Sequence, residues 1–200
     1  MTIIFPKKNE FLKKINKKEN QILWTTLKSD LETPVSTYLK LCKKKTNSFL
    51  LESVQDGTFR GRYSIIGFDP DLIWKCEKGV AYKKILKKKN IKFEKDDKKP
   101  LLSLQNLINS SKINLPNHLP PMSAGLIGYL GYETIEQYEK LPERKKNIIN
   151  IPDGFFIRPT ILAIFDNIKN EITLVTPYWY NSKQKDESAY KKISNNLIKF

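Results

Sequence analysis

The fold is decided by residues 49–67, FLLESVQDGTFRGRYSIIG. Apolar residues lead into Glu52 and Ser53, and the Asp56-Gly57 pair then supplies a turn, because glycine accepts the positive φ angle that tight hairpin turns require. A second extended run, residues 63–68, is rich in β-branched and aromatic residues. The stretch therefore predicts a β-hairpin.

The polar residues of this hairpin could hold a small zwitterion. The Glu52 carboxylate and the Ser53 hydroxyl can accept hydrogen bonds from an ammonium group, while Arg62 and backbone N–H groups can receive a carboxylate. The alternative is a hairpin whose polar residues merely face water. From the residues alone, that plainer interpretation is favoured.

Composition argues against several classes of protein. No stretch of the chain approaches ~18 consecutive apolar residues, so we expect no membrane span, and the first residues lack the apolar core of a signal peptide. The net charge of +15 is almost wholly due to lysine, and arginine occurs only at positions 60, 62, 144 and 158. Proteins that read nucleic acids usually recruit arginine for its bidentate fork. We therefore expect solvated lysine faces and no nucleic-acid partner.

The sequence shows no motif for metal binding or catalysis. Cys42 and Cys76 lie among apolar residues and lysines, and we expect buried free thiols of a cytosolic protein. His118, the single histidine, lies in a proline-flanked linker, and no nucleophile or carboxylate is linked to it by a motif. We expect no catalytic residue and no metal ligand in this chain.

The order of the predicted elements indicates an α+β fold with largely antiparallel sheet. We expect helices at residues 9–28, 33–43, 101–111 and 184–200, hairpins at 49–68, 72–82 and 155–177, an edge strand and loop within 83–99, a linker at 112–121, a buried strand at 122–133, and a short helix plus loop at 134–153. The carboxylate pairs Asp69/Asp71 and Asp96/Asp97 are expected in turns.

Gly125, Gly128 and Gly131 form a Gly-x-x-Gly-x-x-Gly array. A dinucleotide fingerprint needs Gly-x-Gly-x-x-Gly, and a phosphate loop needs a following Gly-Lys-Ser/Thr. Neither pattern is present. The array therefore predicts close backbone packing in a buried element.

Three segments resemble the N-terminal region of anthranilate synthase component I. Residues 50–53 and 61–64 resemble its Leu-Leu-Glu-Ser…Gly-Arg-Tyr-Ser signature, and residues 33–41 look like its Thr-Pro-Val helix. Residues 120–133 are similar to its Pro-Pro…Gly-Tyr-Leu-Gly-Tyr-Asp segment, with Ala124 where glycine is usual and Glu133 where aspartate is common. The segments occur in the order of the family.

The resemblance implies that residues 1–200 are the N-terminal, regulatory region of a chorismate-utilising enzyme, and an incomplete portion of a larger two-sheet α/β sandwich. In that family, a glutamine amidotransferase subunit (component II) in a heterotetramer supplies ammonia, which adds to chorismate. Loss of pyruvate then leaves anthranilate for L-tryptophan synthesis. The catalytic part, which holds Mg²⁺, is expected outside this chain. We therefore expect a cytoplasmic enzyme whose first 200 residues are inactive alone.

The resemblance also implies a feedback site for tryptophan. Leu51, Glu52 and Ser53 occupy the family's allosteric position, and Arg62 and Tyr63 belong to the same motif. Among these residues, the resemblance implies a role in the feedback site most strongly for Ser53. Two alternatives remain open: component I of aminodeoxychorismate synthase, which shares fold and substrate, and a stand-alone amino-acid-binding module without catalysis.

Overall fold

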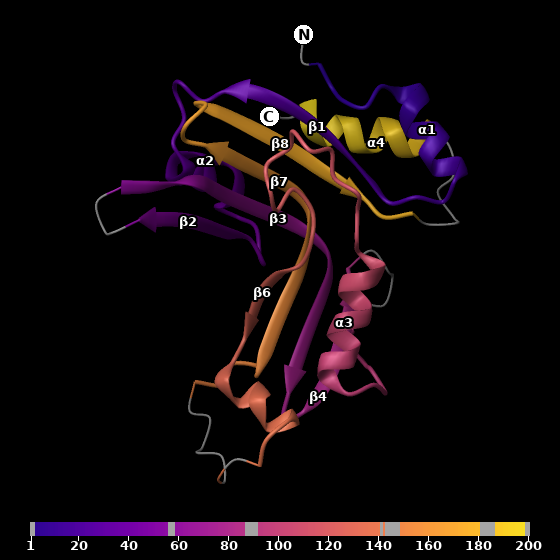
Figure 1. Ribbon diagram of the computed structural model, residues 1–200, viewed down its shortest axis with the longest axis vertical. Coiled ribbons are helices and arrows are strands. Elements are labelled where there is room, and N and C mark those ends of the chain that lie inside the picture. The colour runs from indigo at the N-terminus through magenta and orange to yellow at the C-terminus, as the bar shows by residue number, and fades with distance from the viewer. Residues whose placement is uncertain are drawn as a thin grey trace. The chain divides into compact units, whose positions relative to one another are not determined.

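The computed structural model describes residues 3–55, 59–86, 92–140, 142, 149–180 and 187–198 (Figure 1). Its helices are α1 (Lys8–Asn16), α2 (Pro34–Cys42), α3 (Pro100–Ser110), α4 (Glu187–Ile198) and the 3₁₀ helix η1 (Tyr132–Gln137). Its strands are β1 (Gln21–Lys28), β2 (Phe49–Gln55), β3 (Phe59–Glu77), β4 (Val80–Ile85), β5 (Glu94–Lys95), β6 (Ile127–Leu130), β7 (Gly154–Asp166) and β8 (Glu171–Tyr178). The predicted α+β class with largely antiparallel sheet is confirmed.

The strands pair in the order β1-β8-β7-β3-β4-β5, with β2 added to β3 and β6 added to β7. The chain divides into two compact units. Unit 1 comprises Met1–Asp69, Ser111–Gly125 and Pro159–Phe200, and unit 2 comprises Pro70–Ser110 and Leu126–Arg158. The long strands β3 and β7 therefore contribute residues to both units.

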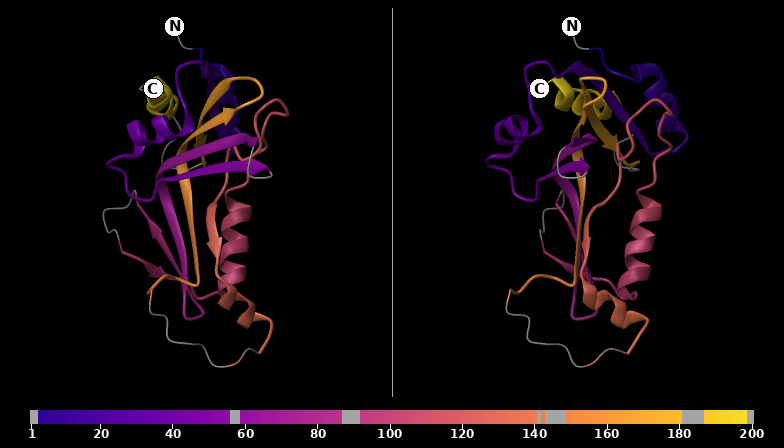
Figure 2. Two further views of the ribbon diagram at one scale, coloured as in Figure 1. Left: turned by 90° about the vertical axis from the view of Figure 1, so that its left-hand side faces the viewer. Right: turned by 60° about the vertical axis from the view of Figure 1, so that its left-hand side comes forward.

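In unit 1, helices α1 and α4 cover one face of the β1–β8 pair (Figures 1 and 2). The two strands are in antiparallel register from Gln21↔Tyr178 to Lys28↔Glu171. Apolar side chains from both helices and from the strands meet in one buried cluster, which includes Phe11, Ile15, Leu23, Cys42, Ile66, Phe68, Phe165, Leu174, Ile193 and Leu197. Burial of this apolar surface is the main force that holds the unit together.

The predicted helix over residues 9–28 is wrong in its second half. Helix α1 ends at Asn16, Lys18 takes a left-handed φ of 60°, and Gln21–Lys28 forms strand β1. The apolar residues of this segment fit both the 3.6-residue period of a helix and the two-residue period of a strand. The local pattern therefore did not distinguish a strand from a helix. Pairing with β8 favours the strand, because it gives the backbone N–H and C=O groups hydrogen-bond partners and buries Leu23 completely.

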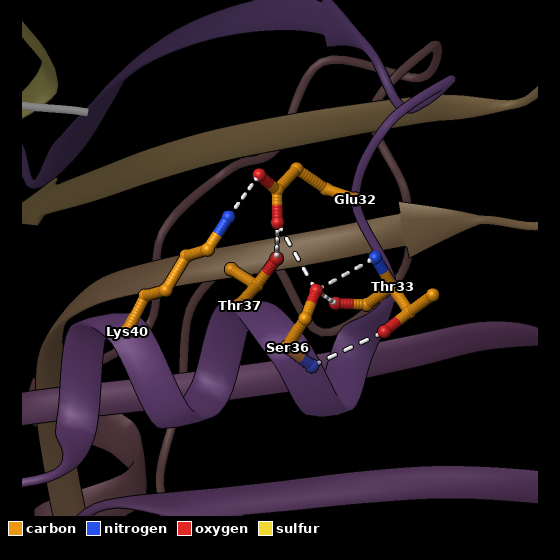
Figure 3. A network of polar contacts seen from close by, with 5 residues as sticks. All are labelled: Glu32, Thr33, Ser36, Thr37 and Lys40. Carbon is orange, nitrogen blue, oxygen red and sulfur yellow. Dashed lines mark hydrogen bonds and ion pairs between the residues drawn. The ribbon is translucent and has the colours of Figure 1, made fainter.

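Helix α2 begins as predicted, with a reciprocal cap at Thr33 (Figure 3). The Ser36 N–H donates to Thr33 Oγ1 at 3.1 Å, and the Thr33 N–H donates to Ser36 Oγ at 3.0 Å. The Glu32 carboxylate accepts from Lys40 Nζ and from the Ser36 hydroxyl (Figure 3). These two hydrogen bonds lower the pKa of Glu32.

In unit 2, Trp74 is fully buried between β3, β4 and helix α3. Its indole N–H donates to the buried Ser103 hydroxyl at 3.0 Å, and Ser103 donates to Asp96 Oδ2 at 2.7 Å. Lys83 Nζ forms an ion pair with the same carboxylate at 2.5 Å. This chain of polar contacts fixes α3 on the sheet without leaving a buried donor unsatisfied.

Further predictions need correction, and one lies outside the described residues. Asp69 and Asp71 lie within strand β3 instead of in a turn, and Asp71 forms an ion pair with Arg158. Asp96 does begin a turn, since its Oδ1 accepts from the Lys98 N–H at 3.1 Å, and it also forms an ion pair with Lys83.

Strand β6 is mostly exposed, not buried. The close packing predicted for the glycine array is confirmed at Gly128, where a Cβ would lie 1.9 Å from the Phe155 carbonyl oxygen, and is wrong at Gly125, where a Cβ would meet nothing within 4 Å. The predicted Asp56-Gly57 turn is among the residues that the structure does not describe.

Candidate functional site

The predicted site residues lie on the β2–β3 hairpin of unit 1, whose pairing is interrupted once. The register moves from Glu52↔Ser64 to Val54↔Arg60. Ser53 therefore faces the segment Gly61–Tyr63 alone, so that β3 carries a bulge opposite it. A bulge next to a functional side chain commonly serves to aim that side chain.

Gly61 allows β3 to approach Ser53 closely. A Cβ atom at position 61 would lie 2.1 Å from Ser53 Oγ and 2.4 Å from Ser53 Cβ. Real Cβ atoms do not come so close to other heavy atoms, so any larger residue at this position would displace Ser53. The glycine of the Gly-Arg-Tyr-Ser motif thus has a direct steric role beside the serine of the Leu-Leu-Glu-Ser motif.

Strand alternation divides the Leu-Leu-Glu-Ser residues between two faces. Leu50 packs against the core under the helices, and Glu52 shares its face. Leu51 and Ser53 lie on the opposite face, where Leu51 is 45% exposed and Ser53 is also exposed. The structure brings Leu51 and Ser53 together and separates Glu52 from them.

Arg62 and Tyr63 are held against each other in the bulge. The Arg62 guanidinium carbon lies 4.8 Å from the centre of the Tyr63 ring, a favourable cation–π geometry. The same guanidinium donates to Asp166, at the end of β7, with an Nη2–Oδ2 distance of 2.9 Å. The carboxylate of Asp166 is 7% exposed and the guanidinium side chain 44%.

The Asp166 carboxylate also organises the turn after β7. Its Oδ1 accepts from the backbone N–H groups of Ile168 at 3.1 Å and Lys169 at 3.2 Å. Burial alone would raise the pKa of Asp166, but the hydrogen bonds from Arg62 and from the two N–H groups outweigh it, and the pKa is lowered. Asp166 is therefore an ionised anchor for both the turn and Arg62.

The neighbouring Asn167 binds the bulge through its backbone and its side chain. Its N–H donates to the Arg62 carbonyl at 2.8 Å, and its Nδ2 donates to the Gly61 carbonyl at 2.7 Å. The residues that face Ser53 are thus tied to the β7–β8 turn by hydrogen bonds that span more than a hundred residues of sequence.

Comparison with known proteins gives this site a context. No protein-family model matches the chain. The chain is 39% identical over 181 residues to anthranilate synthase component 1 of Cereibacter sphaeroides, an overlap of 90% of this chain and 36% of that protein. It is 36% identical over 153 residues to the Thermus thermophilus protein of the same name, covering 76% of this chain and 31% of the relative.

A solved structure agrees with the sequence matches. The structure of anthranilate synthase component I from Streptococcus pneumoniae superposes with a TM-score of 0.56 and 26% identity, covering 86% of this chain and 36% of that one. The chain is related to anthranilate synthase component I. It spans about a third of the length of the relatives it matches.

The described residues do not offer a magnesium site of the kind expected for an anthranilate synthase. Within the described ranges, no three His, Cys, Asp or Glu side chains gather in a group that could hold a metal ion. Cys42 and Cys76 are buried free thiols, as predicted. No described helix is long and apolar enough to cross a membrane.

His118 packs against an aromatic side chain instead of standing free in its linker. Its ring centroid lies 5.6 Å from that of Trp24. Both belong to an open groove of about 780 Å³ in unit 1, lined by Ile3, Phe5, Trp24, Thr25, Thr26, Leu27 and His118. Among the described residues that line this groove there is no carboxylate, cysteine or lysine that could activate His118 as a general base.

Sequence reasoning named one half of this candidate site and missed the other. Leu51, Ser53, Arg62 and Tyr63 are placed within one hairpin, and Gly61 belongs to the quoted motif. Asp166 and Asn167 were predicted only as part of the hairpin over residues 155–177. No local signal joins them to Arg62 and Gly61, because the contact depends on the pairing of β3 with β7.

Proposed function

We propose that these residues form the N-terminal regulatory region of an anthranilate synthase component I. The complete enzyme would convert chorismate and ammonia into anthranilate and pyruvate, with ammonia supplied by a glutamine amidotransferase subunit in a heterotetramer. The observation that carries this proposal is the 39% identity over 90% of the chain to a protein of that name. The Mg²⁺ ligands would lie in a catalytic part beyond this chain, and the enzyme would work in the cytoplasm.

The region's own task, in this proposal, is to bind tryptophan as a feedback inhibitor. Ser53 is exposed next to an exposed apolar side chain, Leu51, on the face that the helices do not cover. A hydroxyl beside an apolar surface suits the polar head and the indole of tryptophan. Arg62 and Tyr63 belong to the same bulge. The side chain of Glu52 lies on the other face of β2, away from Ser53.

The test compares inhibition by tryptophan in the complete enzyme with Ser53 intact or changed. Losing one hydrogen bond to a charged group costs about 1.5–3 kcal/mol, or roughly ten- to a hundred-fold in inhibitor affinity. We expect Ser53→Ala to raise the half-inhibitory tryptophan concentration by that factor, and Ser53→Phe to raise it further by filling the site. Ser110→Ala, in unit 2, serves as the control. Normal sensitivity in Ser53→Ala would refute the proposed site.

Two measurements separate the competing functions. The product formed by the complete enzyme distinguishes anthranilate synthase from aminodeoxychorismate synthase, which would release 4-amino-4-deoxychorismate. The 200-residue chain alone, given chorismate, ammonia and Mg²⁺, should form no anthranilate. Anthranilate fluorescence above the uncatalysed rate, and lost on heating, would contradict the assignment of catalysis to another part of the enzyme.

A further inference from the structure

The bulge opposite Ser53 is held open by the turn that follows β7. Inserted residues leave a strand's regular ladder, so their carbonyl groups need other donors. Asn167 supplies both donors: its backbone N–H for the Arg62 carbonyl at 2.8 Å and its Nδ2 for the Gly61 carbonyl at 2.7 Å. Two carbonyl groups of the bulge therefore take their hydrogen bonds from one asparagine, which binds the backbone of Gly61 and Arg62.

The position of Gly61 controls the position of the Ser53 hydroxyl. Ser53 Oγ occupies the space that a Cβ at position 61 would fill, at 2.1 Å from that point. Any movement of the Gly61 backbone toward β2 would therefore push the hydroxyl aside, and movement away would release it. The Nδ2 hydrogen bond of Asn167 ends on the Gly61 carbonyl oxygen, two covalent bonds from the Gly61 Cα atom.

The turn is held by hydrogen bonds to the carboxylate of Asp166. Asp166 is 7% exposed, and it accepts hydrogen bonds from Arg62, Ile168 and Lys169. The carboxylate is ionised at neutral pH, and its hydrogen bonds with Arg62 and the two N–H groups, which lower its pKa, join the turn to the Arg62 side chain. Asn167 is thus fixed on one side by this turn while it binds the bulge on the other.

We propose that Asn167 is a positioning residue for Ser53 and thereby sets the affinity of the regulatory site for tryptophan. The inference rests on the proposed function, since it concerns the same site. Asn167 acts through the backbone of Gly61 and Arg62 and makes no contact with the inhibitor. Its loss weakens inhibition by letting the Ser53 hydroxyl leave its fixed position.

The decisive variant is Asn167→Asp in the complete enzyme. Aspartate keeps the size of the side chain and the backbone N–H, but it exchanges the Nδ2 donor for an acceptor facing the Gly61 carbonyl. We expect the half-inhibitory tryptophan concentration to rise about ten-fold, as for one lost hydrogen bond. Without tryptophan, kcat and the KM for chorismate should stay within about two-fold of wild type.

Asn170→Asp is the matched control within the same turn. Asn170 has a left-handed φ of 52°, which aspartate tolerates, and its backbone carbonyl accepts from the Ser29 N–H. The substitution makes the same change of charge three residues away, and tryptophan sensitivity should be unchanged. Equal desensitisation in both variants would show a general charge effect and would overturn the inference.

A second readout does not depend on tryptophan. In the complete enzyme without tryptophan, the backbone N–H of residue 167, which donates to the Arg62 carbonyl at 2.8 Å, should exchange faster relative to its intrinsic rate in Asn167→Asp and not in Asn170→Asp. If Asn167→Asp lowers the yield of folded protein, Asn167→Ala removes the donor without adding charge and should give the same acceleration. Unchanged exchange in a folded Asn167 variant would overturn the positioning role.

The outcomes also separate this inference from the proposed function. If Ser53→Ala loses tryptophan sensitivity and Asn167→Asp keeps it, the regulatory site stands and the role of Asn167 is wrong. If Ser53→Ala keeps normal sensitivity, the regulatory site itself is wrong, and the inference falls with it. Desensitisation by both, with Asn170→Asp normal, supports the two together.

Discussion

Two arginine–aspartate pairs link β3 with β7, one in each unit, and they differ in their contact with water. In unit 1, Arg62 is 44% exposed while its partner Asp166 is 7% exposed. In unit 2, Arg158 and Asp71 are 14% and 11% exposed. In one arginine–aspartate pair the cation is half-exposed, whereas in the other both side chains are largely removed from water.

The difference in burial separates two roles for the same chemistry. The Arg158 guanidinium meets Asp71 as a fork, with Nε–Oδ1 at 2.8 Å and Nη2–Oδ2 at 2.9 Å. Such a pair is costly to break, because either partner would be left as a buried charge. Arg62 is screened by water, so its pair contributes less to stability and more to geometry, by holding the bulge beside Ser53. Contacts of equal length can thus have unequal effects.

The largest expected effect is on the buried pair. We expect Arg158→Ala to lower the free energy of unfolding of the 200-residue chain by about 3–5 kcal/mol. The same change at Arg62 should cost less, since solvent screens that side chain and Asp166 keeps its hydrogen bonds from the Ile168 and Lys169 N–H groups. Urea denaturation followed by circular dichroism measures both.

A double variant sharpens the test of the buried pair. Replacing both partners, Arg158→Met with Asp71→Leu, removes the two charges together and should restore most of the stability lost in Arg158→Ala. A loss at Arg62 as large as that at Arg158 would show that burial does not decide the strength of these pairs.

The next effect in size concerns the pH dependence of unit 2. The hydrogen bond from Lys83, followed by that from Ser103, lowers the pKa of Asp96 from 3.8 to about 2. A carboxyl whose pKa is lowered by folding stabilises the protein above its unfolded pKa and loses that effect as the pH falls through the folded value. The shift corresponds to about 2 kcal/mol. This stabilisation should be complete above pH ~5 and vanish by pH ~1.5.

Asp96→Asn isolates that contribution from other acidic groups. The difference in unfolding free energy between wild type and Asp96→Asn should be largest at neutral pH and should shrink steadily as the pH falls from about 4 to about 2. A difference that does not change with pH would mean that the Lys83–Asp96 contact owes its strength to packing and not to charge.

The contrast between these contacts also shows what the sequence could predict about the fold. Helix α2 was predicted because its signals are local: a Thr33 cap followed by Pro34. Strand β1 was not, because its partner β8 lies about 150 residues away and its own pattern fits two structures. Asp71 was predicted in a turn because it follows Pro70, and nothing near it in sequence announces Arg158.

The candidate site divides in the same way. Ser53 and Gly61 could be named from the sequence because each belongs to a motif of consecutive residues, Leu-Leu-Glu-Ser and Gly-Arg-Tyr-Ser. Asp166 and Asn167 act through hydrogen bonds to residues more than a hundred positions earlier. A bulge exists only once two strands are paired, so its anchors follow from tertiary structure and not from local propensity.

A smaller effect is expected at the exposed start of helix α2. Thr33→Ala removes the acceptor for the Ser36 N–H and should cost about 1 kcal/mol. Thr33→Ser retains the hydroxyl and should cost much less, which makes it the control. If both variants lose the same stability, the methyl group of Thr33 and not its cap would be responsible. The effect should stay below that of Arg158→Ala, since water can replace an exposed acceptor.

The smallest effect is expected for the ion pair between Lys28 and Glu171 at the end of the β1–β8 ladder. Its Nζ–Oε1 distance is 3.1 Å, close to the 2.8 Å and 2.9 Å of the Arg158–Asp71 contacts, but Lys28 is 69% exposed and Glu171 31%. Removing one residue of an exposed ion pair costs little stability, because water solvates the charge that remains. Lys28→Ala should therefore change the free energy of unfolding by less than about 0.5 kcal/mol. This change should be smaller still at 1 M salt, because the screening length there is only about 3 Å. Double-mutant analysis with Glu171→Ala measures the interaction alone. A coupling energy above about 1 kcal/mol, or one that resists salt, would break the comparison at its weakest point and show that distance, not burial, sets the strength of these contacts.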